Sequence, residues 1–246
     1  MPDPSQQPKI ALVTGAARRI GRALARDLAQ HGWTVALHCR KSMGEAEALS
    51  REIRADGGTA AVFTADLERV AEIEVLVAAC SERLGPPTCL INNASEFLLD
   101  RIETMDEALW DRHLDVNLKA PVFLAQAMVR HLPGDVHGNI INIIDQRVWK
   151  LTPEFFSYTI SKAGLWTATQ TLAQSLAPRI RVNAIGPGPV LRSVHQSDAA
   201  FDAEKQSTLL KTGPSTAEIA AAVRFILATP SMTGQMIALD SGQHLT

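Results

Sequence analysis

The sequence predicts a single α/β domain in which helices cover both faces of a doubly wound parallel sheet. Short apolar runs without polar alternation, typical of strands buried on both faces, alternate with helical stretches from one end of the chain to the other. The 246 residues, of which 46% are hydrophobic, are enough for one sizeable core. The right-handed crossover rule then places helices on both sides of the sheet. We therefore expect one domain over residues 1–246.

The order of the elements follows from the apolar runs and the Gly, Pro and Asp residues between them. The expected strands cover residues 9–14, 33–38, 59–64, 89–92, 139–145, 180–185 and 236–240. The expected helices include residues 19–30, 106–131, 157–177 and 216–228, with two more that end near residues 56 and 84. The stretch 186–214 is longer than an ordinary connection, so we expect it to be a substrate loop.

Composition argues against several classes of partner. The chain has 24 basic and 26 acidic residues, a net charge of −2 and no block of like charge, so nothing indicates nucleic acid or an anionic membrane surface. No apolar run reaches the roughly eighteen residues of a membrane span, and no signal peptide precedes the first strand. Three cysteines without CxxC spacing favour reduced thiols in the cytoplasm, and the histidine spacing favours no metal.

The first predicted strand leads into a turn suited to a phosphate. The segment from Thr14 to Gly21 reads TGAARRIG. Gly15 allows a tight turn, and Gly21 lets the following helix pack closely on the strand, as in a Rossmann dinucleotide-binding fold. A plain β-turn before a helix remains the alternative, but the position directly after the first strand favours the cofactor.

The end of the second predicted strand predicts NADPH as the cofactor. NAD-specific folds place an acidic residue there for the ribose 2′-hydroxyl, whereas this chain reads His38-Cys39-Arg40-Lys41-Ser42. Two cations and a hydroxyl suit a 2′-phosphate, to which Arg40 can bind through two hydrogen bonds. The alternative is a solvated basic turn.

Tyr158 and Lys162 form the candidate catalytic pair. Tyr158 is the chain's one tyrosine, and Lys162 follows four residues later, on the same face of a predicted helix. An ammonium near a phenol is expected to lower the pKa of the phenol toward neutrality and make it a usable proton donor.

These motifs together resemble the short-chain dehydrogenase/reductase family over nearly the whole chain. The resemblance rests on TGAARRIG, NNAS (residues 92–95), Asn117 in DVNLKAP, Tyr158 with Lys162, and VNAIGPGPV. It implies that Tyr158 donates the proton, that Lys162 holds the ribose, that Asn117 supports a water relay and that Asp66 contacts the adenine. The wider set implied to contact the cofactor is Gly15, Arg18, Arg19, Ile20, Gly21, Asp66, Leu67, Asn93, Ala94, Ser95, Lys162 and Gly188.

Two departures from the common family pattern narrow the expected substrate. Asp145 stands thirteen residues before Tyr158, where the family usually has a serine, and Arg19 replaces a glycine of the turn. An ionised carboxyl would repel a developing oxyanion, but an acid suits a ring nitrogen that must receive a proton. A strand-end Asp that only caps the next loop is the alternative.

The same departures resemble the pteridine reductases and the related dihydromonapterin and dihydrofolate reductases of this family. That resemblance implies that a pterin contacts Arg19, Ser95, Phe97, Asp145 and Tyr158, with Phe97 stacked on the ring. A core position for Phe97 is the alternative. A carbonyl or 3-oxoacyl reductase and a catalytically silent cofactor sensor are the other functions considered. We also expect a homotetramer.

Overall fold

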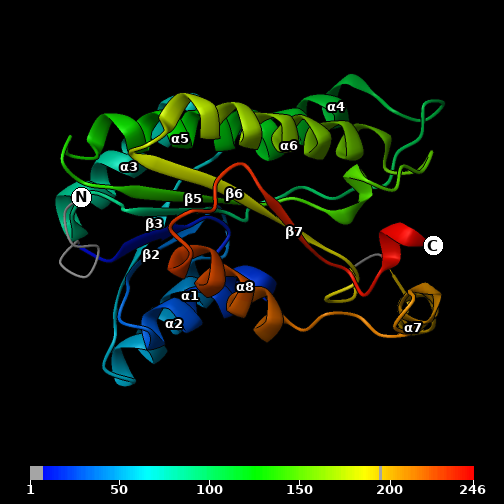
Figure 1. Cartoon of the computed structure of the whole chain (residues 1–246), viewed down its shortest axis with the longest axis horizontal. Helices are drawn as coiled ribbons and strands as arrows, with labels where there is room; N and C mark the ends of the chain where they lie inside the picture. The colour runs from blue at the N-terminus through cyan, green and yellow to red at the C-terminus, as the bar shows by residue number, and fades with distance from the viewer. Residues whose placement is uncertain (1–7, 194–195) are drawn as a thin grey trace.

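The chain folds into one seven-stranded parallel sheet between two layers of helices (Figure 1). The structure is a computed structural model that describes residues 8–193 and 196–246. The first seven residues of the expected domain and residues 194–195 of the expected substrate loop lie outside the described residues. The strands are β1 (Ile10–Val13), β2 (Thr34–Cys39), β3 (Thr59–Thr64), β4 (Cys89–Asn92), β5 (Gly138–Ile143), β6 (Ile180–Pro187) and β7 (Met236–Leu239).

The helices that follow these strands cover the sheet in two groups. They are α1 (Arg19–Gln30), α2 (Met43–Ala55), α3 (Val70–Leu84), α4 (Glu107–Leu114), α5 (Ala120–His131), α6 (Phe156–Leu176), α7 (Asp198–Ser207) and α8 (Thr216–Ala228). Figure 1 shows α1, α2 and α8 on one face of the sheet and α3, α5 and α6 on the other. Each face carries its own apolar core, one around Leu24 and Ile226 and the other around Leu76 and Leu124.

The strand order creates the crevice in which the candidate site lies. The order is β3-β2-β1-β4-β5-β6-β7, so the chain reverses direction across the sheet between β1 and β4. At such a switch point the loops that follow the two central strands diverge and leave an opening beyond their carboxyl ends. The sheet thereby brings the turn after Val13 and the segment after Asn92 to the same edge.

Two segments differ from the sequence prediction in ways that matter for the site. The helix expected over 106–131 is interrupted between α4 and α5 by a π-helical segment, η2 (Asp115–Lys119), which contains the buried Asn117. The expected loop 186–214 is partly regular, because β6 continues to Pro187 and α7 lies inside the loop. Within the described residues no helix is both long and apolar enough to span a bilayer.

Candidate active site

A cleft of about 1270 Å³ lies at the carboxyl edge of the sheet, and a second cavity of about 170 Å³ adjoins it. The cleft gathers the predicted residues Gly15, Arg18, Arg19, Ile20, Gly21, Asn93, Ala94, Ser95, Phe97, Asp145, Tyr158, Lys162 and Gly188. The smaller cavity is lined by the predicted residues His38, Arg40, Asp66 and Leu67, together with Gly15, Ala94 and Ser95. Neither cavity is lined by Lys41, Ser42 or Asn117.

The turn after β1 has the close packing that the two glycines predict. Gly15 has a φ of 62°, and a Cβ there would lie 3.0 Å from the Cα of Ala94. A Cβ at Gly21 would lie 2.2 Å from the carbonyl oxygen of Gly15, so a side chain at either position would displace the turn. Helix α1 has no side-chain cap and no acidic residue in its first turn, which leaves its N-terminal N–H groups to an anion.

Thr14 and Asn93 hold the two diverging segments together. The Thr14 hydroxyl accepts hydrogen bonds from the backbone N–H groups of Asn93 at 2.9 Å and Ala94 at 3.0 Å. The Asn93 side chain donates to the carbonyl oxygens of Thr14 and Gly15 at 2.9 and 3.2 Å. The side chain of Asn93 therefore braces the turn, and its neighbours Ala94 and Ser95 form the wall of both cavities.

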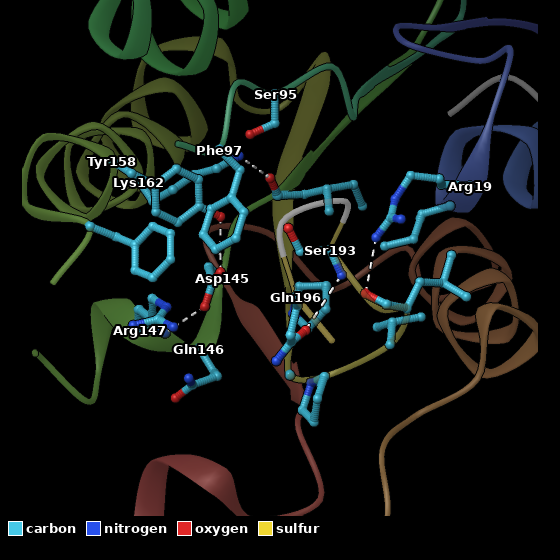
Figure 2. A pocket seen from close by; sticks show the side chains of 18 of the residues that line it. Arg19, Ser95, Phe97, Asp145, Gln146, Arg147, Tyr158, Lys162, Ser193 and Gln196 are labelled. Carbon is cyan, nitrogen blue, oxygen red and sulfur yellow. Dashed lines mark hydrogen bonds between the residues drawn. The ribbon is translucent and has the colours of Figure 1, made fainter. Parts of the chain in front are cut away.

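Arg19 extends from the turn to the expected substrate loop. Its backbone is left-handed, with a φ of 53°, and its guanidinium donates to the carbonyl oxygens of Leu191 at 3.0 Å and Arg192 at 2.7 Å. Figure 2 shows Arg19 on the side of the cleft opposite Asp145. Arg19 thus joins the phosphate turn to the loop that closes the cleft.

His38 is buried beneath the turn after β1. The side chain is 2% exposed. Its Nδ1 accepts a hydrogen bond from the Gly15 backbone N–H at 3.2 Å, and its Nε2 lies 3.1 Å from the carbonyl oxygen of Ala65. Burial lowers the pKa of His38 to about 4, so the ring is neutral. His38 therefore supports the turn from below and lines the smaller cavity, and its contact with the cofactor stays a prediction.

Arg40 is engaged by acidic side chains that its neighbours in the sequence do not reveal. The Arg40 guanidinium donates to Glu68 at 2.6 Å and to Glu96 at 3.0 Å, and it lies 3.8 Å from Asp66. These carboxylates follow β3 and β4, so the parallel register brings them to the end of β2 although they are far away in the sequence. An incoming phosphate at Arg40 would have to displace them.

Asp145 and Tyr158 meet in the cleft, as the sequence predicts. The Tyr158 hydroxyl donates to Asp145 Oδ2 at 2.9 Å, while Asp145 Oδ1 accepts from the Arg147 backbone N–H at 2.9 Å. The carboxyl therefore caps the short helix η3 (Gln146–Val148) and contacts the tyrosine at the same time. Burial raises the pKa of Asp145 above its ordinary value, which favours the protonated acid.

Lys162 does not lower the pKa of Tyr158, which corrects the sequence-based expectation. Burial, and then the adjacent Asp145 carboxylate, raise the pKa of Tyr158 well above its ordinary value. The Lys162 ammonium lies 5.7 Å from the centre of the Tyr158 ring and donates to the Ile143 carbonyl oxygen at 2.9 Å. Burial lowers the pKa of Lys162 itself to about 8. Tyr158 is consequently a neutral phenol with a proton to donate.

Asn117 lies behind the cleft wall. Its side-chain oxygen accepts from the Ser95 hydroxyl and the Glu96 backbone N–H, and its Nδ2 donates to the Glu96 carbonyl oxygen and the Ser161 hydroxyl, all within 2.9–3.1 Å. These bonds fix the segment after β4 to α6. The water-relay role of Asn117 stays a prediction.

Phe97 lies in the cleft wall and stacks on a residue that the sequence did not single out. Its ring is parallel to that of Phe155, with a centroid distance of 4.4 Å and an interplanar angle of 5°. The rings of Phe97 and Tyr158 meet edge to face, with a centroid distance of 4.7 Å. The Arg147 guanidinium covers the Phe155 ring at 4.8 Å. Arg147 lies in the short helix η3 and Phe155 directly precedes α6, so their one sequence signal is proximity to Asp145 and Tyr158.

The other end of the cleft is polar. Gln196 and Gln243 donate to the two carboxylate oxygens of Glu204 at 2.9 and 3.2 Å. These three residues come from the loop after β6, α7 and the C-terminal turn, and no motif pointed to them. Across the described residues, no group of three or more His, Cys, Asp and Glu side chains is arranged to hold a metal ion.

Comparisons with known proteins agree with this geometry. The short chain dehydrogenase family model matches residues 9–202. The 3-oxoacyl-[acyl-carrier-protein] reductase FabG of Staphylococcus epidermidis is 31% identical over 242 residues, which cover 96% of this chain and 99% of that protein.

Two solved structures are more similar in sequence. The FolM alternative dihydrofolate reductase 1 of Brucella canis, complexed with NADP, is 53% identical with a TM-score of 0.94, over 96% of this chain and 94% of that one. The corresponding Brucella suis protein, also in complex with NADP, is 52% identical with a TM-score of 0.94, over 98% and 96%. With the matched residues running from the phosphate turn past Tyr158 and Lys162, the chain belongs to the short-chain dehydrogenase/reductase family.

Proposed function

We propose that this protein uses NADPH to reduce a C=N bond of a pterin or dihydropterin. The observation that carries the proposal is the hydrogen bond of 2.9 Å between the Tyr158 hydroxyl and the Asp145 carboxylate, in the wall of the cleft. A carboxyl with a raised pKa beside a neutral phenol is a proton source, which a C=N bond requires at its nitrogen. The likeness to the Brucella dihydrofolate reductases supports the same substrate class.

The residues of the cleft fit a dinucleotide. Gly15 and Gly21 let the turn pack closely against Asn93 and Ala94 beside the uncapped N-terminus of α1, where a pyrophosphate would bind. The smaller cavity, beside Asp66 and Leu67, is of a size and position for the adenine end. Arg40, whose fork-shaped guanidinium can bind a phosphate through two hydrogen bonds, borders that cavity. The Brucella structures contain NADP, which supports NADPH here.

In the proposed mechanism, different residues bind the cofactor and deliver the proton. When bound, the reduced nicotinamide supplies the hydride that the carbon of the C=N bond receives. Lys162, which is 2% exposed and lines the cleft, would hold the ribose of the cofactor and keeps a positive charge close to Asp145. Tyr158 gives the proton to the nitrogen and protonated Asp145 replaces it through their shared hydrogen bond, or protonated Asp145 gives its proton directly to the nitrogen; water then re-protonates Asp145.

Two other functions have less support. A carbonyl or 3-oxoacyl reductase agrees with the likeness to FabG at 31% identity, but such an enzyme stabilises an oxyanion, which Asp145 in its ionised form would repel. A silent cofactor sensor would have no need of Tyr158 and Lys162, which here lie in the cleft.

One assay tests the proposed function. NADPH oxidation is followed with dihydrobiopterin, dihydromonapterin, dihydrofolate and a panel of ketones and a 3-oxoacyl thioester. We expect turnover with at least one of the pterin or folate substrates and little with the carbonyl compounds. Efficient turnover of a carbonyl compound together with none of the pterins would replace the proposal with the carbonyl reductase function.

The remaining expectations concern the chain as a whole. We propose one reductase domain over residues 1–246 with residues 186–214 as its substrate loop, located in the cytoplasm, where the three buried free cysteines would stay reduced. We also propose a homotetramer, which would cover exposed apolar residues such as Ile160 on α6 and Phe225 on α8. Light scattering at micromolar concentration checks the assembly, and a monomer would contradict it.

A further inference from the structure

Three buried polar side chains, linked by hydrogen bonds, lie directly behind the aromatic wall of the cleft, which is formed by Phe97 and Phe155. Asp100 in the loop after β4, His113 in α4 and Ser157 in α6 are each at most 1% exposed. His113 Nδ1 lies 2.6 Å from the Ser157 hydroxyl, and that hydroxyl donates to Asp100 Oδ2. None of the three lines the cleft, so the proposed proton delivery does not use them.

The direction of these hydrogen bonds is fixed by the backbone. His113 Nε2 accepts from the Leu98 backbone N–H at 3.2 Å, which requires Nε2 to be unprotonated. In the neutral ring Nδ1 then carries the proton and donates to the Ser157 hydroxyl, whose own hydrogen goes to the Asp100 carboxylate. Every link therefore has a single donor and a single acceptor, and loss of one member leaves buried polar atoms unpaired.

The backbone segments that carry Phe97 and Phe155 are hydrogen-bonded to these three buried side chains. Leu98, whose backbone N–H donates to His113, directly follows Phe97. Phe156 and Ser157, which follow Phe155, donate their backbone N–H groups to the carbonyl oxygen and the carboxylate of Asp100 at 3.4 and 3.1 Å. The three buried side chains thus link the two backbone segments whose rings stack with a centroid distance of 4.4 Å.

The backbone conformation of Phe155 indicates that surrounding contacts hold this residue in place. Its φ of 55° and ψ of 48° lie in the left-handed region, which an aromatic residue rarely adopts. Such a conformation persists where surrounding contacts over-determine it, and it is common at ligand-binding sites. Here the Arg147 guanidinium on the ring and the Asp100 bonds to the next two residues supply those contacts.

We propose that the Asp100–Ser157–His113 chain is a positioning network that holds Phe97 and Phe155 as one preformed wall for a flat heteroaromatic substrate. The network acts through the two rings and takes no part in proton transfer. It sets the affinity for the substrate and leaves that for the cofactor unchanged. This inference rests on the proposed reduction of a pterin, because the substrate must have a face that stacks on Phe97.

The test is Ser157→Ala, which removes the central hydroxyl and adds no bulk. With the dihydropterin that the wild type reduces best, we expect the KM to rise about tenfold, equivalent to about 1.4 kcal/mol, while kcat and the KM for NADPH change less than about threefold. The matched control is Ser50→Ala, which removes a buried hydroxyl on α2 that donates to the Ala60 carbonyl oxygen at 3.2 Å. The control is expected to lose comparable thermal stability and keep its KM.

A crystal structure of the same variant makes the result independent of the substrate. We expect Phe155 to leave the left-handed region and the two rings to separate. If the wild type reduces no pterin, the proposed function fails, and this structure alone decides the network. An unchanged KM, or unchanged rings in the variant, overturns the network and leaves pterin reduction intact. Should Ser157→Ala not fold, His113→Asn, which keeps a donor toward Ser157 and loses the acceptor for Leu98, carries the same two measurements.

Discussion

Asp145 uses its two carboxylate oxygens for different partners: Oδ2 accepts from the Tyr158 hydroxyl and Oδ1 from the Arg147 backbone N–H, both at 2.9 Å. The hydrogen bond from Arg147 holds the carboxyl in place at the wall of the cleft. Asp145 thus caps the loop and is also the proposed proton donor, and replacing the side chain by its amide separates the two roles.

We predict that Asp145→Asn lowers turnover of a dihydropterin by about two orders of magnitude, within the usual range for loss of a general acid. The amide can still accept from the Arg147 N–H, so the loop and the NADPH affinity should change little. Steady-state kinetics and NADPH titration measure both effects. Asp106→Asn, at the cap of α4 outside the cleft lining, is the control. Near-native turnover in Asp145→Asn would reduce Asp145 to a loop cap.

The pH profile of kcat/KM should fall on its alkaline side. Because burial raises the pKa of Asp145, the acid keeps its proton to a higher pH than an exposed carboxyl and loses it as the pH rises. Lys162, with a pKa of about 8, loses its charge in the weakly alkaline range as well. The two groups are coupled, so the profile reports apparent values for the set. Asp145→Asn should change the descending limb of the profile, and a profile identical to the wild type would argue against Asp145 as the acid.

Arg40 is predicted to give at least a tenfold preference for NADPH over NADH, which is about 1.4 kcal/mol. Arg40→Asp should shrink or reverse it. Because Glu68 and Glu96 hold the guanidinium, Glu68→Gln and Glu96→Gln should each tighten NADPH binding and leave NADH binding nearly unchanged. Catalytic efficiencies with both cofactors measure the first claim, and titration measures the second. Equal efficiency of the wild type with NADPH and NADH would exclude a selective role for Arg40.

His38 should make the fold sensitive to acid. Its folded pKa of about 4 lies below the unfolded value of 6.5, so below pH 6.5 the unfolded chain binds a proton that the folded protein rejects. The stabilisation is complete above pH 6.5 and is lost as the pH falls toward 4. His38→Asn, whose amide oxygen can accept from the Gly15 N–H, should reduce this loss. Denaturant melts between pH 7 and 4 measure it, and equal slopes for the two proteins would show that other groups cause the acid sensitivity.

The sequence predicted the fold well because each strand is a local apolar run and the glycine turn is a local motif. It also predicted the Asp145–Tyr158 contact, which the family resemblance places at one edge of the sheet. It failed where partners come from separate loops. Arg40 was judged by its neighbours in the chain, whereas Glu68 and Glu96 reach it from other strand ends. The pKa of Tyr158 was judged by the charge of Lys162, whereas burial dominates.

The π-helical turn at Asn117 has a consequence for which changes in length the protein can tolerate. Each residue rotates a helix by about 100°, so the extra residue in the 115–119 turn sets the angle between the face of α4 that carries His113 and the face of α5 packed on the sheet. A deletion there would turn Asn117 away from Ser95 and Ser161, even with every side chain retained. Substitutions at the half-buried Asp115 and Lys119 of this segment should be accepted far more readily than the removal of a single codon.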